Sequence, residues 1–307
     1  MSKIFIIVAT YNAIPWLSKC FKSTKPYSVV VVDNNSIDNT VSFIKDNYTS
    51  ISILPQKENI GFGAANNIGI SYALRQGADY VFLLNQDAYL EKDTIEKLIE
   101  VHKKNDNFGI LSPIHLNGKG DRLDQNFSNY VNYAANPDFY SDFVLKKPLP
   151  IVYKVPFVNA AGWLISRQCL ETIGGFDPVF FHYGEDDNYC QRVLFHGLKI
   201  GVVPKVFLKH DRETRIFKQE LDGEKGIFSK QEREVKMEYA NINNEDFSEV
   251  KNLIKNRHKT AIKLFIKLRF KSSKFYRMEA KLLKKIYSEI EKSRLLNKAK
   301  GPTYLDL

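Results

Sequence analysis

Four short apolar runs, each ending in a polar loop, constrain the fold of this chain more than any other feature. The runs cover Ile4–Ala9, Val29–Val32, Ile51–Leu54 and Tyr80–Leu84, and helix-like segments follow the first three. Runs of this length are too short to span a bilayer and are typical of strands buried in a parallel sheet. The alternation predicts an α/β fold in which the polar loops gather along one edge of the sheet.

The loop after the fourth run, Asn85-Gln86-Asp87, carries a carboxylate. Because open α/β folds bind ligands beyond the carboxyl ends of their strands, we expect Asp87 to point into a cleft. A carboxylate there suits Mg²⁺ or Mn²⁺, which bind through one or two carboxylates and leave coordination positions for substrate phosphates. The alternative is that Asp87 only caps the next helix.

The loops after the second and third runs are suited to a nucleotide. Asp33 and Asn34 can hydrogen-bond to a base or ribose, and the small residues after Gly61 let backbone N–H groups approach a diphosphate at a helix start. Each loop also has a structural explanation, because Asx-rich turns commonly follow strands. The Gly61 loop lacks the third glycine of a GxGxxG fingerprint and follows the third strand, which argues against a dinucleotide-dependent oxidoreductase.

The second half of the chain adds an acidic triplet and a histidine. The triplet, residues 185–187, occupies the first turn of a predicted helix, where carboxylates meet the positive end of the helix dipole. A carboxylate held there is also well placed to act as a general base. Two further predicted strands, 200–203 and 206–209, deliver His210 to a loop, where its imidazole could complete a metal shell begun by Asp87.

Composition describes an ordinary globular chain of 307 residues, 44% hydrophobic. Its three cysteines lie far apart without CxxC spacing, so neither a disulfide framework nor a structural zinc site is expected. No signal-peptide pattern is found, and a cytoplasmic location is expected. Residues 251–307 hold 17 Lys and Arg against 4 Asp and Glu, a net of +13, so residues 1–250 carry −3 of the total of +10.

Six ordered motifs resemble the family 2 glycosyltransferases of the GT-A fold, and within them the rhamnosyltransferase-like branch. The match covers roughly residues 3–212, and its motifs lie at residues 8–12, 31–40, 59–67, 84–87, 174–177 and 184–186, with His210 after them. The resemblance implies a Rossmann-like, mostly parallel sheet flanked by helices. It also implies a nucleotide-sugar donor, a divalent cation bridging the diphosphate to a DxD-type motif, and direct displacement with inversion.

The resemblance also implies the site residues. Asp186 falls where the family keeps its catalytic base, and Asp87 and His210 would hold Mg²⁺ or Mn²⁺. Near the sugar or the acceptor would lie Gly162, Trp163 and Glu185, with core packing as the alternative for Trp163. The implied donor-binding residues are Thr10, Tyr11, Asp33, Asn34, Gly61, Asn67, Gln86 and Asp87.

Two positions depart from the family pattern. The first acidic position of the DxD motif is Asn85, so one charge is missing from the expected metal site. The branch usually carries another acid two residues after Asp186, where this chain has Asn188, while Asp187 supplies an extra charge. The first departure bears on metal affinity and the second on the identity of the base.

The predicted catalytic domain covers residues 1–215, and residues 216–307 form a basic, mainly helical extension whose helices are expected from about residue 245. Segment 262–270 mixes apolar and basic residues densely, which favours peripheral contact with the inner face of the cell membrane. Packing on the catalytic domain or on another subunit is a nearly equal alternative. Nucleic acid is not expected as a partner, because no nucleic-acid motif accompanies the charge.

The expected activity is transfer of a sugar, rhamnose from dTDP-rhamnose, to a glycan or lipid-linked glycan acceptor in bacterial surface polysaccharide synthesis. A UDP-sugar is the alternative donor. A sugar nucleotidyltransferase is the alternative enzyme, although the loop after the first strand lacks the basic, glycine-rich phosphate loop which that reaction needs. A third hypothesis is an inactive glycan-binding homologue, for which Asn85 is the only hint.

Overall fold

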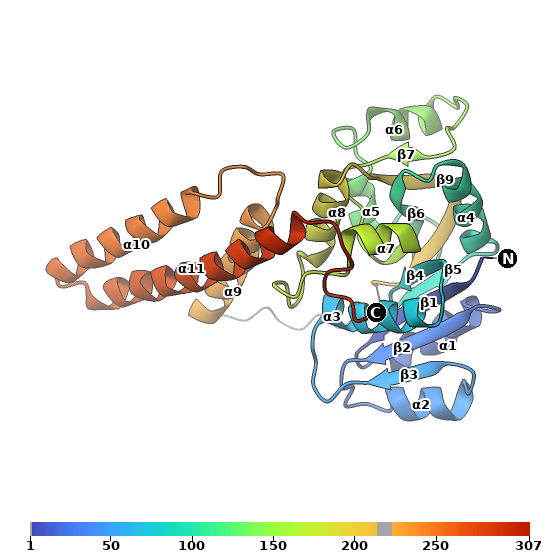
Figure 1. The fold of residues 1–307 in the computed structure, drawn as a ribbon, viewed down its shortest axis with the longest axis horizontal. Coiled ribbons are helices and arrows are strands. Elements are labelled where there is room, and N and C mark those ends of the chain that lie inside the picture. The colour runs from blue at the N-terminus through green and yellow to red at the C-terminus, as the bar shows by residue number, and fades with distance from the viewer. Residues whose placement is uncertain (1, 214–222) are drawn as a thin grey trace. The chain divides into compact units, whose positions relative to one another are not determined.

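The computed structural model describes residues 2–213 and 223–307, which fall into two compact units (Figure 1). In the described part of the chain, the first unit contains residues 2–213 together with 300–307, and the second contains 223–299. The predicted boundary between residues 215 and 216 lies outside the described residues. Residues 300–307, which the prediction assigned to the extension, pack with the first unit.

Within its described residues, the first unit holds a nine-stranded mixed sheet. Four strands lie side by side and parallel, in the order β3 (Ser52–Pro55), β2 (Ser28–Asp33), β1 (Ile4–Thr10) and β4 (Tyr80–Leu84). The sheet continues through β8 (Gly162–Ser166), β6 (Phe108–Asn117), β9 (Lys199–His210) and β5 (Ala88–Leu90), and the short β7 (Tyr153–Lys154) pairs with β9. The pair β6 and β9 is parallel, and the remaining pairs of this half are antiparallel.

Both faces of the sheet are covered, which explains why its strands are apolar throughout. On β1, Phe5 and Ile7 belong to one core and Ile6 and Val8 to the other, because successive side chains of a strand point to opposite faces. The first face is covered by α3 (Phe62–Arg75), α5 (Gln125–Tyr130), α6 (Pro137–Val144), α7 (Arg167–Ile173) and α8 (Glu185–Phe195). The second face is covered by α1 (Ile14–Ser23), α2 (Thr40–Asn47) and α4 (Thr94–Lys104).

The end of the sheet differs from the sequence prediction. Segments 200–203 and 206–209 are not two strands but parts of the single strand β9. The strand continues through Pro204 because its register against β6 shifts there: Val203 pairs with Pro113 and Phe207 with Ile114. A bulge of this kind accommodates a proline, which cannot donate to the sheet.

The second unit is helical and contains α9 (Glu224–Tyr239), α10 (Glu249–Ile266) and α11 (Phe270–Asn297). The buried face of α11 includes Ala280, Leu283 and Ile286. Helix α9 was not expected, since the predicted helices began at about residue 245. In the described ranges 2–213 and 223–307, no helix is long and apolar enough to cross a bilayer.

Candidate functional site

The turn between β4 and β5 brings Asp87 next to His210. Strand β5 pairs with the end of β9, and the backbone N–H of Asp211 donates to the carbonyl of Asp87 at 2.8 Å. Oδ1 of Asp87 lies 3.5 Å from Nε2 of His210, and each residue is only 1% exposed. The fold therefore brings together the two predicted metal ligands, although they are far apart in the sequence.

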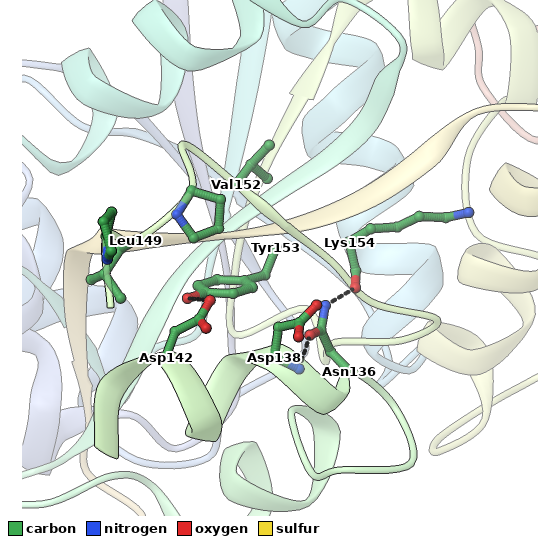
Figure 2. Close-up of a pocket in the computed structure, with 9 residues that line it drawn as sticks. Asn136, Asp138, Asp142, Leu149, Val152, Tyr153 and Lys154 are labelled. Atoms are coloured by element: carbon green, nitrogen blue, oxygen red, sulfur yellow. Dashed lines mark hydrogen bonds between the residues drawn. The ribbon is translucent and has the colours of Figure 1, made fainter. Parts of the chain in front are cut away.

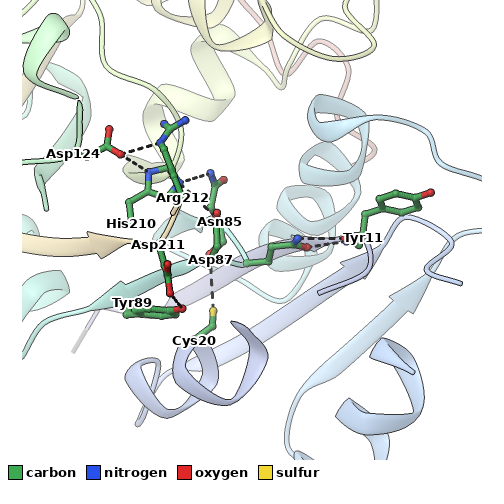
Figure 3. Close-up of polar contacts among 10 residues, drawn as sticks. Tyr11, Cys20, Asn85, Asp87, Tyr89, Asp124, His210, Asp211 and Arg212 are labelled. Carbon is green, nitrogen blue, oxygen red and sulfur yellow. Dashed lines mark hydrogen bonds and ion pairs between the residues drawn. The ribbon is translucent and has the colours of Figure 1, made fainter. Parts of the chain in front are cut away.

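Asn85 lies beside the same pair, as Figure 3 shows. Its backbone N–H donates to the carbonyl of Ala161 at 3.1 Å, and its Nδ2 lies 3.4 Å from Nε2 of His210. The Oδ1 of Asn85 is buried and has no hydrogen-bond partner among the described residues. Because buried polar atoms nearly always have partners, this oxygen marks a position where a ligand could bind.

Two residues that the sequence motifs did not single out complete this cluster (Figure 3). Oδ2 of Asp124 lies 4.0 Å from Nδ1 of His210 and 2.9 Å from Nε of Arg212. Oδ1 of Asp124 accepts a hydrogen bond from the backbone N–H of Phe127 at 2.9 Å, which caps α5. The His210 ring therefore has a carboxylate on each side, and a second carboxylate of this kind typically fixes the orientation of a ligating imidazole.

Asp186 lies in the first turn of α8, as predicted from the sequence. Its Oδ2 accepts a hydrogen bond from the backbone N–H of Ala160 at 3.0 Å, whereas its Oδ1 is buried and lacks a hydrogen-bond partner within residues 2–213 and 223–307. Burial raises the pKa of Asp186, and the N–H of Ala160 opposes this rise. A helix dipole lowers the pKa of a carboxyl in this position, so desolvation is the stronger effect here.

Glu185, the preceding residue, is also buried, with 5% of its surface exposed. Burial is the main cause of the raised pKa of Glu185, and the neighbouring charge of Asp186 raises this pKa further. The side chain packs against the start of α3, where a Cβ added at Gly63 would lie 3.6 Å from the Cβ of Glu185. Adjacent buried carboxyls with raised pKa values are typical of functional sites.

A short chain of contacts connects the two acidic positions. The backbone N–H of Ala160 donates to the Asp186 carboxylate. The carbonyl of the next residue, Ala161, accepts from the backbone N–H of Asn85. The positive charge of Arg212, which pairs with Asp124, also lowers the pKa of Asp186. Asp87 and Asp186 therefore belong to one cluster at the carboxyl end of β4.

The loops after β1 and β2 are held by side-chain hydrogen bonds. Oδ1 of Asp33 accepts from Oγ1 of Thr10 at 2.9 Å and from Oγ of Ser36 at 2.6 Å. The Gln86 amide accepts from the N–H of Tyr11 at 2.8 Å and donates to its carbonyl at 3.3 Å. Thr10 is 0% exposed and Asp33 1%, so both support these loops from within the protein.

Two asparagines hold the Gly61 loop and the helix α3 that follows it. Asn34 accepts from the N–H of the residue before Gly61 at 3.2 Å and donates to the carbonyl of Gly61 at 3.3 Å. Both ends of the Asn67 amide bond the backbone of Phe176, at 2.7 and 2.8 Å. Gly61 has φ of 87°, and a Cβ there would lie 2.1 Å from the carbonyl oxygen of Phe181, so this position requires glycine.

The sugar contact predicted for Trp163 does not agree with the structure. The residue is 0% exposed, and its ring stacks on Phe176 with centroids 5.9 Å apart, beside Tyr189. Its role is therefore packing, the alternative reading of the sequence. At Gly162 a Cβ would lie 2.1 Å from Cδ2 of Leu208, so close packing alone explains a glycine there.

Two surface hollows lie apart from the acidic cluster. One, of about 410 Å³, is lined by α6, β7 and the segment between them, where the Tyr153 hydroxyl donates to Asp142 at 3.0 Å (Figure 2). Tyr153 pairs with Val202, in the half of β9 remote from His210. The other, of about 830 Å³, is lined by the loop after β1, the start of α1, the end of the loop after β2 and α2. In this structure the titratable cluster, not the depth of a hollow, marks the candidate site.

Asp87 and His210 are suitable ligands for a divalent cation. Atoms 3.5 Å apart can share an ion that lies about 2.1 Å from each, and a carboxylate with an imidazole suits Mn²⁺. In the part of the chain that the structure describes, no group of three His, Cys, Asp or Glu side chains could hold a metal ion. The pair therefore fits an ion that takes its remaining ligands from water and substrate oxygens.

The family model described as "Glycosyl transferase family 2" matches residues 5–174, more than half of the chain. This chain belongs to the family 2 glycosyltransferases. The matched residues include β1 to β4, the Gly61 loop and Asp87. Family membership identifies the chain as a glycosyltransferase and decides against the nucleotidyltransferase alternative.

Two relatives support the rhamnosyltransferase-like branch. The chain is 26% identical to the dTDP-rhamnosyl transferase RfbF of Shigella flexneri over 223 residues, which are 70% of this chain and 72% of that protein. It is 24% identical to the N-acetylglucosaminyl-diphospho-decaprenol L-rhamnosyltransferase of Mycobacterium tuberculosis over 238 residues, 67% of this chain and 75% of that protein.

The predicted GT-A fold is confirmed by solved structures. A mannosyltransferase from Pyrobaculum calidifontis, solved with GDP-Man and Mn²⁺, matches with a TM-score of 0.53 at 20% identity, over 78% of this chain and 63% of that chain. Staphylococcus aureus TarS residues 1–349, solved with UDP, matches with a TM-score of 0.51 at 16% identity, over 82% and 69%. At these identities the likeness concerns the fold alone.

Proposed function

We propose that this chain transfers rhamnose from dTDP-rhamnose to a glycan or lipid-linked glycan acceptor, with inversion, in synthesis of a bacterial surface polysaccharide. The proposal is supported mainly by the cluster described above. Within it, residue 160 bonds to Asp186, and residue 161 bonds to Asn85, which lies beside the Asp87 and His210 pair. The choice of donor follows the names of the two relatives. A UDP-sugar is the alternative donor.

Asp87 and His210 would hold Mg²⁺ or Mn²⁺ in this proposal, with Asp124 orienting the imidazole. A bound divalent cation stabilises the negative charge that develops on the leaving diphosphate. Because Asn85 replaces one carboxylate of the motif, the protein supplies one negative charge fewer. We therefore expect the cation to bind weakly without the donor and more tightly with it.

Asp186 would act as the general base. Its Oδ2 is fixed by the N–H of Ala160, and its Oδ1, which no other described group bonds, can accept the proton of the attacking hydroxyl. Glu185 is held against Gly63 instead and stays a proposed sugar contact. One base, without a second carboxylate acting as nucleophile, gives inversion, by analogy with glycoside hydrolysis.

The donor-binding loops divide into two groups in this proposal. Asn34, Asn67 and Gln86 use both ends of their amides on backbone groups, so we expect them to position the loops and not to touch the donor. Tyr11 and Gly61 are expected to form the nucleotide-facing surface, supported from within by the buried residues Thr10 and Asp33.

Thermal-shift measurements against a panel of nucleotide sugars test the proposal. With Mn²⁺ present, dTDP-rhamnose should raise the melting temperature more than UDP-sugars or GDP-mannose, and EDTA should remove the effect. A ligand at a hundred times its Kd adds about 2.7 kcal/mol to the free energy of unfolding. A panel in which no nucleotide sugar stabilises the chain, or in which EDTA changes nothing, would contradict the proposed site.

A further inference from the structure

The turn between α10 and α11 carries a cluster of exposed apolar side chains, which we call the apolar tip. Their exposed fractions run from 48% to 74%, and every residue from 265 to 272 is exposed. Large apolar side chains gathered on a surface usually mark an interaction site, whereas scattered ones do not. The tip consists of Ile262, Phe265, Ile266, Leu268 and Phe270.

The apolar tip has a defined structure. The Ser273 hydroxyl donates to the carbonyl of Ala261 at 2.8 Å and joins the two helices directly behind the turn. The rings of Phe265 and Phe270 meet edge to face with centroids 5.4 Å apart, and the Arg277 guanidinium lies 5.2 Å from the Phe265 ring centre. The exposed side chains are therefore presented on a structured turn.

Leu268 is the least expected residue of the tip. Its φ is 55°, in the left-handed region that glycine and asparagine adopt most readily, and its side chain is 74% exposed. Within the second unit a leucine here adds backbone strain and almost no burial. A residue that the fold itself does not favour points to a requirement from outside the fold.

The tip is surrounded by positive charge. Residues 251–278 contain ten Lys and Arg and no Asp or Glu, with lysines at every fourth position from Lys251 to Lys271. On α10 this spacing places the lysines along one stripe of the helix. Among the described residues, Arg257 is the one cation of this segment that forms an ion pair, with Glu279.

We propose that the apolar tip inserts into the surface of a bilayer that contains anionic lipid. The apolar side chains would leave water at the level of the acyl chains, while the surrounding cations meet the headgroups. A second copy of this chain is a poorer occupant, because the same surface on that copy is equally basic. The proposal specifies a surface for membrane contact and does not depend on the proposed sugar transfer.

Flotation of the full chain with lipid vesicles tests the proposal. It should float with vesicles of phosphatidylcholine and phosphatidylglycerol and much less with phosphatidylcholine alone. Leu268→Asn removes an apolar side chain where asparagine suits the backbone, so the variant should fold and yet bind anionic vesicles at least tenfold more weakly. The matched control is Leu295→Asn on α11, since Leu295 is 76% exposed and lies outside the tip.

Charge is tested by a second matched pair. Lys267→Gln with Arg269→Gln should weaken binding by about fivefold per cation removed. Lys281→Gln with Lys284→Gln, an equal change of charge away from the tip, should weaken it less. Equal effects of the two pairs, or binding of Leu268→Asn equal to that of Leu295→Asn, would overturn the proposal.

Two further results separate the alternatives. If the chain dimerises without lipid and Leu268→Asn makes it monomeric, the tip is a self-association surface and the proposal is wrong. Asp186→Asn should bind vesicles like the unmodified chain. If the unmodified chain binds vesicles but does not turn over the donor, the proposed function is wrong and the proposed membrane surface is still supported.

Discussion

Asp124 shows how a residue outside any recognised motif contributes to the candidate site. It caps α5 through one oxygen and faces His210 and Arg212 with the other. Nothing in its sequence neighbourhood indicates this, because its partners come from the end of β9. Motif residues such as Asp87 were predictable since their position after a buried strand fixes where they point, whereas Asp124, Trp163 and the Asn67 amide depend on long-range packing.

Asp87→Ala should weaken Mn²⁺-dependent donor binding by at least tenfold, because it removes the carboxylate of the proposed metal pair. Calorimetric titration of dTDP-rhamnose at several Mn²⁺ concentrations measures this. Asp124→Asn, which keeps the shape of the side chain, should have a smaller effect of the same sign. An unaltered affinity of Asp87→Ala across the Mn²⁺ titration would remove Asp87 from the metal site.

The rate of donor turnover should depend on pH through the raised pKa of Asp186. A general base must be deprotonated, so turnover should fall as pH decreases through that pKa, at a midpoint well above the ordinary carboxyl value of about 4. A pH–rate profile of dTDP release checks this. A midpoint near the ordinary value would show that burial does not control the base.

The free energy of unfolding should decrease as pH rises, whereas the turnover should increase. A carboxyl whose pKa is higher in the folded than in the unfolded state stabilises the fold while protonated, and this contribution is lost as pH rises through the folded pKa. Glu185 and Asp186 both act this way. Asp186→Asn should therefore raise the melting temperature at alkaline pH and change it little at acidic pH, and an equal change at both would contradict this.

At the scale of elements, the segment 300–307 supports the site without belonging to it. The backbone N–H of Gly175 donates to the carbonyl of Thr303 at 2.8 Å, and the N–H of Asp306 donates to Oγ of Ser71 at 3.0 Å. Leu305 packs against the core that α3, α7 and α8 share. The segment therefore fastens α3 to the loop that precedes α8.

Deleting residues 300–307 should reduce the free energy of unfolding by about 3 kcal/mol, since the hydrogen bonds to Gly175 and Ser71 and the packing of Leu305 are lost. Urea unfolding followed by circular dichroism measures the change. The control is Asp306→Asn, whose side chain is 96% exposed and whose ion pair with Arg75 should contribute little. Equal stability of the deleted and full chains would show that the segment is not part of the first unit.

Element types were predictable where the sequence pattern is local. The run Tyr80–Leu84 is a strand with these bounds, because five consecutive apolar residues suit only a buried element of that length. Strand β9 was divided in the prediction because a bulge that accepts Pro204 leaves no sign in the sequence. Helix α9 was missed because few of its residues are buried, so its apolar periodicity is weak.

At the scale of the whole molecule, the two units would have different functions, and the positive charge of the chain belongs mainly to the second unit. The first holds the glycosyltransferase fold and the cluster around Asp87 and Asp186, and the second holds the apolar tip. The sequence motifs made the fold predictable because several of them lie at the ends of successive strands, such as β1, β2 and β4. The cluster itself follows from tertiary contacts such as the bond between Ala160 and Asp186.

The most direct measurement compares donor affinity with turnover in Asp186→Asn, using Asp187→Asn as the neighbouring control. With Mn²⁺ present, Asp186→Asn should bind dTDP-rhamnose within twofold of the unmodified chain and release dTDP at least about a hundredfold more slowly, because it keeps the site and loses the base. Asp187→Asn should retain most of its turnover. Unchanged turnover in Asp186→Asn would contradict a single site in which Asp87 holds the cation and Asp186 removes the proton.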